Sequence, residues 1–387
     1  MTEHYQLTSE QNILKETVGR MAQEKIGPYA AEIDETGEFP WDVHEQLKEL
    51  GLFGLVIPEE YGGSDAGMLS ALLALEEIGR VCSSSAIICA APIVVGRIIL
   101  ESGNNEQKRK YLPQIASGET IPAFALTESE ADSDLARLST KADREENRYI
   151  INGRKYFVPL ADVAGLMTVF ARTGQGSAMD AVSVFVVERN NPGWSVSRIE
   201  RKMGTQAIHD CELIFERCVI PEANRVGKQG EGFIIAMRSQ EVSCILTAAR
   251  TIGLAQGAFD YALGYTQERI QFGRSISSFQ GIQFMLAEMA MQIEAGRYLL
   301  YKAGAEMDRG AEEGYLYGSM AKCFVTDMAM KVTTDAVQLL GGYGYMKDHP
   351  VERMMRDAKL TQVVEGTNQS RRLMVGRKIL KRYQAAV

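Results

Sequence analysis

The sequence predicts an α+β protein with three consecutive domains: an N-terminal α-helical domain, a central β domain and a C-terminal α-helical bundle. Three observations predict this order. The first third is rich in apolar helical stretches, and the last third carries apolar residues at three- and four-residue spacing. Between them, the apolar runs are short, β-branched and separated by turns. We place the domains at residues 1–120, 121–228 and 229–387, which suits a chain of 387 residues.

The first domain is expected to be helical along most of its length. The segment Ser9–Ile33 is rich in helix-forming residues. Pro40 precedes a helix that begins at Trp41, and Gly51 stops it. After this helix-rich segment, further helical stretches are expected over residues 41–50, 69–80, 86–101 and 107–117.

The middle third is typical of a small β domain. The dipeptide Asn152-Gly153 lies inside an apolar run and favours the two-residue turn of a β-hairpin. We therefore expect a hairpin over residues 149–158 with its turn at this dipeptide. Further strands are expected over residues 166–171, 182–187 and 211–215.

The last third returns to helical patterns. One face of a long helix is marked by Ile282, Met285, Met289, Ile293 and Leu300. The segment Met307–Gly310 ends this helix, because glycine is a common residue just past a helix C-terminus. Two more helices are expected over residues 314–340 and 369–383.

Charge and hydropathy exclude some classes of partner. The net charge of −8 disfavours nucleic acid as the main partner. The N-terminus, Met-Thr-Glu-His-Tyr, lacks the basic head and apolar run of a secretory signal. No stretch reads as long and apolar enough to cross a bilayer, so we expect no membrane insertion and a cytoplasmic location.

Cysteine and histidine positions give no sign of a metal site. The six cysteines have no Cys-x-x-Cys spacing and are typical of reduced thiols in a cytosolic protein. The four histidines lack the spacing of zinc ligands. We therefore expect no metal. The Gly-x-Ser-x-Gly motif of serine hydrolases and a Gly-Lys-Ser/Thr phosphate loop are also absent from the sequence.

Three strings in the last third stand out by their order and spacing. They are Arg-Ile-Gln-Phe-Gly at 269–273, Gln-Leu-Leu-Gly-Gly-Tyr-Gly-Tyr at 338–345 and Val-Val-Glu-Gly-Thr at 363–367. In the third string Glu365 precedes Gly366, which lets the backbone approach a ligand while the carboxylate points at it. Each string is a weak signal alone, and the three together are a strong one.

With further strings along the chain, these motifs resemble the acyl-CoA dehydrogenases, most closely the short-chain members. The further strings include those at 52–63, 125–128, 152–155, 211–215 and 230–233. The resemblance covers nearly the whole chain. It implies an α domain, a barrel-like β domain and a four-helix C-terminal domain, assembled as a homotetramer.

The resemblance also implies a function: a flavoprotein oxidoreductase of acyl-CoA metabolism and fatty acid oxidation, with FAD as its cofactor. Glu365 would take the C2 proton of an acyl-CoA thioester while the C3 hydride goes to flavin N5. Hydrogen bonds to the thioester carbonyl, one from the backbone N–H of Glu365, would stabilise the enolate. An electron-transferring flavoprotein would then receive the electrons.

The resemblance assigns the other candidate residues as well. Arg269 matches an arginine that contacts the FAD pyrophosphate across a subunit interface, and a guanidinium fork suits phosphate oxygens. The candidates for cofactor binding are Leu126, Thr127, Ser133, Phe157, Arg269, Gln271, Phe272, Gln280, Gln338, Gly341, Gly342, Thr367 and Gln369. The candidates for substrate binding are Ser133, Glu241, Cys244 and Gly366.

Single residues also have simpler interpretations. Glu365 could stabilise the N-terminus of the helix that follows it, and Arg269 could be an exposed arginine at a helix end. Gly341 and Gly342 could form a helix C-cap and a turn. His209 could meet a polar group of the ligand or lie in an exposed loop.

Several positions depart from the usual family pattern near the ligands. Pro159 stands where a threonine normally bonds flavin N5, and proline has neither a hydroxyl nor an N–H group. Cys244 replaces an arginine close to the base, which should alter the proton affinity of that base. Gln206 replaces another common arginine. Glu241 is a second, weaker candidate for the base.

These departures keep three functions open. The first is dehydrogenation of an acyl-CoA. The second is a reductase, or a dehydrogenase of a cyclic or branched acyl-CoA. The third is a catalytically weakened subunit of a hetero-oligomer. Residues 90–93 lie where relatives enclose the acyl tail, and they offer no basic partner to a carboxylated acyl chain.

Overall fold

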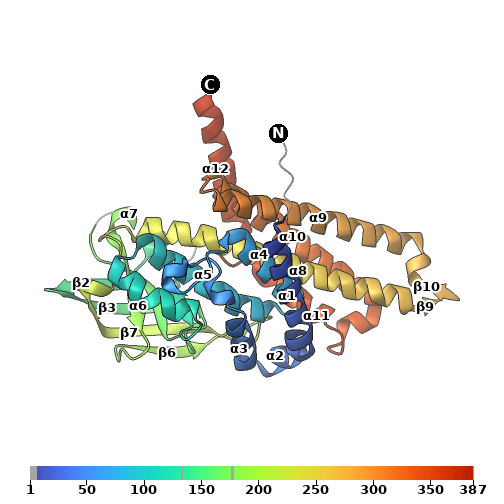
Figure 1. Ribbon diagram of the computed structural model, residues 1–387, viewed down its shortest axis with the longest axis horizontal. Coiled ribbons are helices and arrows are strands. Elements are labelled where there is room, and N and C mark those ends of the chain that lie inside the picture. The colour runs from blue at the N-terminus through green and yellow to red at the C-terminus, as the bar shows by residue number, and fades with distance from the viewer. Residues whose placement is uncertain (1–6, 132–133, 176–177, 387) are drawn as a thin grey trace.

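The computed structural model describes residues 7–131, 134–175 and 178–386. Three parts follow one another along the chain: a helical part, a β sheet and a second helical part whose long helices extend from the body as an arm (Figure 1). The predicted order of helical, β and helical domains is confirmed.

The first helical part contains six α-helices joined by short helical turns. The elements are α1 (Ser9–Met21), η1 (Ala22–Ile26), η2 (Gly27–Tyr29), α2 (Ala30–Thr36), α3 (Trp41–Glu49), η3 (Leu52–Gly54), η4 (Glu59–Tyr61), α4 (Gly67–Gly79), α5 (Ser83–Ser102) and α6 (Asn105–Ala116). Two of them begin with a capping box, Thr8 with Gln11 at α1 and Asn104 with Gln107 at α6.

The helix-rich segment 9–33 is helical but is not one continuous α-helix. The chain passes from α1 into one π-helical segment and one short 3-10 turn before α2 begins. Gly27 and Pro28 lie at this break. Because proline has no N–H group and its ring crowds the preceding turn, a regular α-helix does not continue through it.

The middle part is one mixed sheet of eight strands in the order β6-β7-β3-β2-β4-β5-β8, with β1 paired to β4. Only the β1–β4 ladder and one β2–β4 pair are parallel. The elements are β1 (Pro122–Ala125), η5 (Leu135–Arg137), β2 (Lys141–Glu145), β3 (Arg148–Pro159), β4 (Leu166–Arg172), α7 (Ala178–Ala181), β5 (Val182–Glu188), β6 (Trp194–Ile199), β7 (Asp210–Pro221), η6 (Glu222–Asn224) and β8 (Arg225–Val226).

The hairpin turn predicted at Asn152-Gly153 is wrong. Strand β3 runs through this dipeptide, and the hairpin turn lies earlier, between β2 and β3. The pairing of β3 with β7 slips between Ile151 and Gly153, and Asn152 Oδ1 accepts the Arg217 N–H at 2.7 Å. A Cβ at position 153 would lie 2.5 Å from Thr140 Oγ1, so the glycine permits close packing at a bulge.

A buried ion pair fixes the chain that follows β1. Lys155 on β3 is fully buried, and its Nζ lies 2.8 Å from Glu128 Oε1 and 2.8 Å from the Leu126 carbonyl oxygen. Burial opposes ionisation of Glu128. The charge of Lys155 and the hydrogen bonds from Lys155, Ser139 and Thr140 prevail and lower the pKa of Glu128 to about 2.

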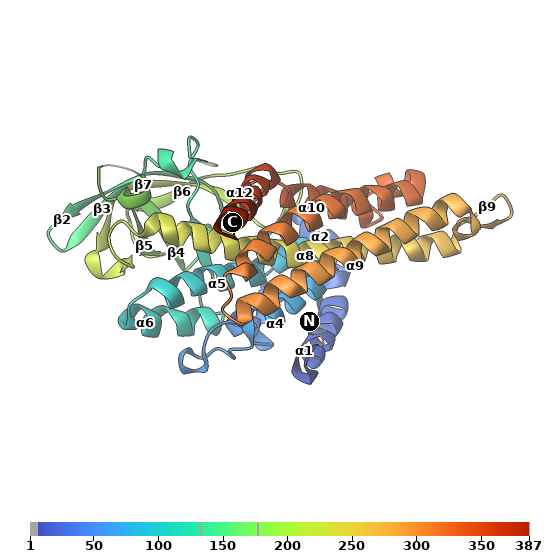
Figure 2. The same cartoon turned by 90° about the horizontal axis from the view of Figure 1, so that it is seen from above.

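The C-terminal part is built on three long helices that pack against one another. The elements are α8 (Gly232–Glu268), β9 (Ile270–Gln271), β10 (Arg274–Ser275), η7 (Ile276–Ser278), α9 (Gln280–Asp308), α10 (Glu313–Leu340), η8 (Gly341–Tyr345), α11 (Val351–Thr361) and α12 (Asn368–Ala386). Seen from above, α8 and α9 run side by side to the β9–β10 hairpin at the end of the molecule opposite the sheet (Figure 2).

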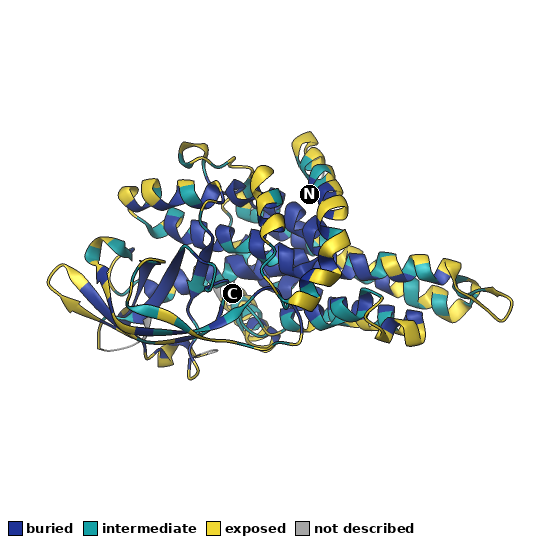
Figure 3. Ribbon diagram, turned by 90° about the horizontal axis from the view of Figure 1, so that it is seen from below, coloured by how far each residue is buried: buried dark blue, intermediate teal, exposed yellow. Residues whose placement is uncertain are grey.

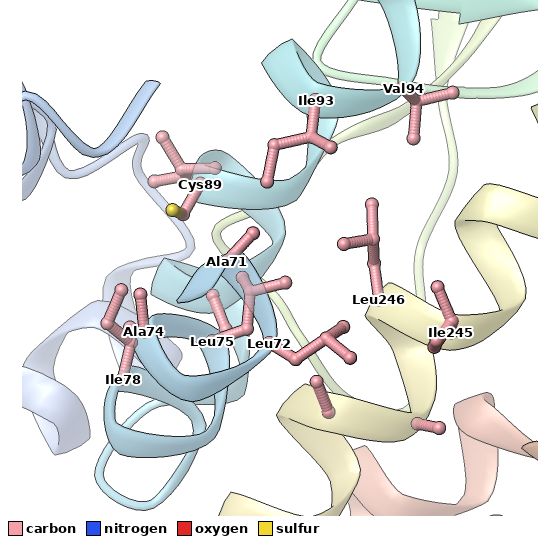
Figure 4. Packing of buried hydrophobic residues seen from close by; sticks show 14 of the residues in the cluster. Ala71, Leu72, Ala74, Leu75, Ile78, Cys89, Ile93, Val94, Ile245 and Leu246 are labelled. Carbon is pink, nitrogen blue, oxygen red and sulfur yellow. The ribbon is translucent and has the colours of Figure 1, made fainter. Parts of the chain in front are cut away.

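Buried residues concentrate in the body of the molecule and become sparse along the arm (Figure 3). In the body, helices α4, α5 and α8 share one apolar core. Leu72 of α4, Ile93 of α5 and Leu246 of α8 belong to it and are at most 1% exposed (Figure 4). Helix α8 therefore links the core to the exposed arm.

The expectation that no stretch could span a membrane needs correction. By length and composition, helices α5 and α8 both meet the requirements of a membrane span. In the fold, however, 72% of the apolar window of α5 and 89% of that of α8 are buried inside the protein. The packing of the core accounts for their apolar composition.

We predict that Lys155→Met destabilises the fold by about 3–5 kcal/mol, because it leaves the buried Glu128 carboxylate without its counter-ion. Urea denaturation followed by circular dichroism measures the change. The exposed Lys141 on the neighbouring strand β2 gives the control, and Lys141→Met should change the free energy of unfolding little. Equal stabilities of the two variants would contradict the structural role of the pair.

Candidate functional site

Glu365 lies in the short connection between α11 and α12, in a left-handed backbone conformation with φ 59°. This conformation is uncommon for a residue with a side chain and persists only where the surroundings hold it. The Glu365 carbonyl oxygen accepts hydrogen bonds from Arg371 Nε at 2.9 Å and Arg371 Nη2 at 2.7 Å. Cys244 Sγ on α8 lies 3.2 Å from the same oxygen. Two helices thus hold the main chain of Glu365.

The next residues are held just as firmly from α10. Lys322 Nζ donates to the Gly366 carbonyl oxygen at 2.9 Å and to Asn368 Oδ1 at 2.8 Å. Gly366 has φ 77°, and a Cβ there would lie 3.0 Å from Arg371 Nε. The glycine after Glu365 is therefore required both by the backbone conformation and by the close approach of the arginine.

The surroundings of the half-buried Glu365 carboxyl combine partial removal from water with positive charges. Burial raises the pKa of this carboxyl, and Arg371, Arg250, Lys322 and a hydrogen bond with Ser243 oppose the rise. No main-chain or side-chain acceptor for the backbone N–H of Glu365 is found among the described residues. The site therefore presents a carboxylate with raised proton affinity next to a free N–H donor.

The segment after β1 lies against β3. The Thr127 carbonyl oxygen accepts the Tyr156 N–H at 2.9 Å. One residue further along β3, Phe157 has φ 52° and is 59% exposed, at a place where the pairing of β3 with β7 slips. Pro159 pairs with Asp210 on β7 and has no N–H to donate. An exposed aromatic side chain in a strained conformation is typical of a ligand-contact position.

A second candidate region lies on the arm. A cavity of 540 Å³ is lined by Tyr265, Arg269, Gln271, Ile276, Gln338, Leu339, Leu340, Gly341, Gly342, Tyr343 and Met346. The Arg269 guanidinium lies over the Tyr343 ring, 5.7 Å from its centroid. Gly341 has φ 61°, and a Cβ at Gly341 or Gly342 would meet no atom within 4 Å. Because the two glycines have no side chains, they leave space in the cavity. The cavity also contains Arg269, whose guanidinium is a side chain of the kind that binds phosphate.

Three family models match the chain. The N-terminal, middle and C-terminal domains of acyl-CoA dehydrogenase match residues 8–119, 123–218 and 230–380. The chain belongs to the acyl-CoA dehydrogenase family. Its reaction is FAD-dependent dehydrogenation of an acyl-CoA thioester.

Individual acyl-CoA dehydrogenases are similar over almost their full length. The acyl-CoA dehydrogenase of Bacillus subtilis is 43% identical over 97% of this chain and 99% of its own length. The cyclohex-1-ene-1-carbonyl-CoA dehydrogenase of Geobacter metallireducens is also 43% identical, over 97% of this chain and 99% of its own.

Solved structures give the same result. The butyryl-CoA dehydrogenase of Megasphaera elsdenii has a TM-score of 0.95 at 35% identity, with 97% of this chain and 100% of that chain covered. A chain from a structural study of the electron transferring flavoprotein of Acidaminococcus fermentans and flavin-based electron bifurcation has a TM-score of 0.96 at 42% identity. The match covers 97% of this chain and 99% of that chain.

The residues present fit FAD in an acyl-CoA dehydrogenase. Arg269 beside the open glycine wall of the arm cavity suits the pyrophosphate. The half-buried Thr127 hydroxyl makes no hydrogen bond among the described residues, so it can bond a ligand there. Phe157 is exposed and can stack on an aromatic ring system. Ser133, predicted to bind both cofactor and substrate, lies outside the described residues.

The remaining cofactor candidates lie at exposed or helix-end positions. Phe272 is 92% exposed in the turn between β9 and β10, and Gln280 is exposed at the start of α9. Thr367 caps α12 by accepting the Ser370 N–H at 3.2 Å, and Gln369 is exposed. Leu126 is buried, and its carbonyl oxygen binds Lys155.

The structure shows what Cys244 does in place of an arginine. The thiol is fully buried, and burial raises its pKa to about 12, so it stays neutral. It serves as a hydrogen-bond donor to the loop. Positive charge reaches the base instead from Arg371 on α12, which contacts the same carbonyl oxygen. Sequence reasoning missed Arg371, although it lies only six residues after the base, in the first turn of the helix that follows.

Glu241, the second candidate for the base, is engaged in an ion pair. Its Oε1 lies 3.1 Å from Lys378 Nζ, in an ion pair that joins α8 to α12. His209 lies in a loop but is not exposed. Its Nδ1 lies 2.6 Å from Asp162 Oδ2, and its Nε2 lies 2.8 Å from the Gly37 carbonyl oxygen. It joins the sheet to the N-terminal helices.

We predict that Arg269→Gln weakens FAD binding roughly 10- to 100-fold, because a hydrogen bond to a charged group contributes about 1.5–3 kcal/mol. The flavin-to-protein absorbance ratio after purification and FAD titration of the apoprotein measure the loss. Arg274 lies on the other strand of the same hairpin and packs on Phe279. Arg274→Gln should keep its flavin, and an equal loss in both variants would contradict the assignment.

Proposed function

We propose that Glu365 is the catalytic base that removes the C2 proton of the acyl-CoA thioester. The observation that carries this proposal is the geometry of the Glu365 loop: a half-buried carboxylate whose main chain is held by Arg371, Cys244 and Lys322. A base fixed in this way needs little reorganisation when substrate arrives.

The acidity of the C2 proton is the chemical difficulty, and the residues around Glu365 address it from both sides. Burial raises the pKa of the carboxyl, which makes it a stronger base than a carboxylate in water. The free backbone N–H of Glu365 is placed to donate to the thioester carbonyl and stabilise the enolate. Arg250 and Lys322 add positive charge near the developing negative charge.

When bound, FAD supplies the acceptor for the C3 hydride at N5, which no side chain can provide. The protein side of that site is Thr127, Phe157 and the cavity around Arg269. Because Pro159 cannot donate, this chain lacks the hydrogen bond that a threonine would make there.

We also propose a homotetrameric, cytoplasmic enzyme of fatty acid oxidation that passes its electrons to an electron-transferring flavoprotein. The arm supports the oligomer: the β9–β10 hairpin lies at the end of the molecule opposite the sheet, so Arg269 and Phe157 would meet one FAD only through a second copy (Figure 2). The similarity to the chain studied with the flavoprotein of Acidaminococcus fermentans supports the electron acceptor.

A cyclic acyl-CoA is the second candidate substrate. The similarity to the cyclohex-1-ene-1-carbonyl-CoA dehydrogenase of Geobacter metallireducens favours it. A weakened, non-catalytic subunit is disfavoured, because the base, its free N–H and its cations are all present and held in place.

We predict that Glu365→Gln lowers kcat for butyryl-CoA by roughly 10²–10⁴-fold while FAD stays bound, because this is the usual contribution of a positioned general base. Anaerobic bleaching of the flavin band near ~450 nm by butyryl-CoA is the readout. The exposed Glu119 provides the control, and Glu119→Gln should retain full activity. Loss of bleaching in Glu241→Gln, with bleaching kept in Glu365→Gln, would reverse the assignment of the base.

We predict that Arg371→Gln moves the acid limb of the pH profile of kcat/KM to higher pH by roughly 1 unit or more. Glu365 must be ionised to accept a proton, and Arg371 lowers the pKa that burial has raised. Removal of the cation therefore raises that pKa, and activity appears only at higher pH. Arg372→Gln removes an exposed arginine of the same helix and should leave the limb in place.

A further inference from the structure

Arg250 on α8 is a buried cation that the reaction described above uses only through its charge. The residue is 4% exposed, and burial lowers its pKa to about 10. Its Nη1 donates to Ser83 Oγ at 2.8 Å. Among the described residues, the guanidinium makes this one hydrogen bond. No carboxylate of these residues lies within salt-bridge distance of the guanidinium.

An arginine in this state is costly for the free protein. Removal of a guanidinium from water is repaid only when acceptors or counter-ions surround it. The side-chain nitrogen and oxygen atoms that are buried without a hydrogen-bond partner do not include Nε or Nη2 of Arg250. Both atoms therefore border accessible space. The Arg250 guanidinium can therefore donate hydrogen bonds to a further acceptor, which the polypeptide does not supply.

The partner of Arg250 is the first residue of a 20-residue helix. Ser83 begins α5, and its side chain is 1% exposed. No partner for the backbone N–H groups of Ser83 and Ser84 is found among the described residues. Free N–H groups at a helix N-terminus and the positive end of the helix dipole both favour an anion. The guanidinium and the helix therefore converge on one small region.

This region lies close to the base. Ser243, Thr247 and Arg250 follow one another at four- and three-residue spacing and so share one face of α8. Ser243 bonds the Glu365 carboxyl, and Arg250 begins seven residues later, or ~10 Å along the helix axis. The Arg250 charge lowers the pKa of Glu365, so a single electrostatic field covers both groups.

We propose that Arg250, with Ser83 and the N-terminus of α5, binds a carboxylate at the far end of a short acyl chain, so that the substrate class is the ω-carboxyacyl-CoA thioesters. The proposal rests on the proposed function, since Glu365 must act on C2 of the same molecule. Segment 90–93 of α5 offered no basic partner in the sequence. The partner comes instead from α8, which packs against α5.

Three carboxylates, Glu365, Asp357 and Asp210, act on Arg250 through their charge, and none of them forms an ion pair with it. Glu365 is the proposed base, and the other two are engaged elsewhere. Asp357 accepts the Thr205 N–H at 2.6 Å, and burial raises its pKa to about 6, which reduces its negative charge. Asp210 Oδ2 lies 3.1 Å from Lys202 Nζ. A substrate carboxylate would therefore be the first counter-ion in direct contact with the Arg250 guanidinium.

The test compares three thioesters on the FAD-loaded enzyme: glutaryl-CoA, its ω-methyl ester and butyryl-CoA. The methyl ester has the reach of glutaryl-CoA without its charge. We expect glutaryl-CoA to have the highest kcat/KM. In Arg250→Gln the ratio of glutaryl-CoA to methyl ester should fall roughly 10- to 100-fold, the effect of one charged hydrogen bond of about 1.5–3 kcal/mol. Arg250→Lys should restore part of the ratio.

Calorimetric titration of glutaryl-CoA into the Glu365→Gln holoenzyme gives binding without turnover. The same 10- to 100-fold loss of affinity should follow when Arg250→Gln is added. The exposed Arg238 of the same helix is the control, and Arg238→Gln should leave both the ratio and the affinity unchanged.

The two possible failures are distinguishable. If none of the three thioesters bleaches the flavin of the wild-type enzyme, the proposed dehydrogenation is wrong. If butyryl-CoA bleaches it but Arg250→Gln reduces kcat/KM equally for all three thioesters, Arg250 acts only through Glu365 and the carboxylate site is overturned.

Discussion

The buried positive charges around the Glu365 loop are the constraint on which the rest of the structure depends. Lys322 and Arg371 are inside the protein because loop carbonyl oxygens accept their hydrogen bonds and the charge of the Glu365 carboxylate lies near them. The carboxylate is tolerated there because those cations lie near it. This mutual dependence joins α8, α10 and α12 at one point. It also explains how a strained conformation at Glu365 persists: the energetic cost falls on a loop that several charged hydrogen bonds hold in place.

A second buried pair does the same for the cofactor side of the enzyme. Glu128 and Lys155 connect the chain after β1 to strand β3. Thr127 directly precedes Glu128, and Phe157 lies two residues after Lys155. The buried Glu128–Lys155 pair thus positions Thr127 and Phe157, which are free to contact a ligand. In both places a costly buried charge fixes the register of a segment whose own backbone pairing is irregular.

Near the base, the neutral Cys244 and several cations from other helices surround the Glu365 loop. Cys244 contributes a neutral thiol that supports the loop, and Arg371 and Arg250 bring positive charge to Glu365 from other directions. Arg250 in particular lies further along α8, toward Ser83, where it can distinguish substrates by the end of the acyl chain.

The sequence by itself determined the order of the three parts and the family, and it pointed to Glu365 as the proposed base. Helix α10 lies within one residue of its expected start and ends where expected, because apolar spacing and glycine stops are local properties. Glu365 was found because a short string contains both the carboxylate and the glycine that its conformation needs. The turn at Asn152-Gly153 was wrong because Thr140, a distant residue, decides between a turn and a bulge. Arg371 and Arg250 were missed for the same reason: whether a cation meets a carboxylate depends on how separate helices pack, which only the tertiary structure decides.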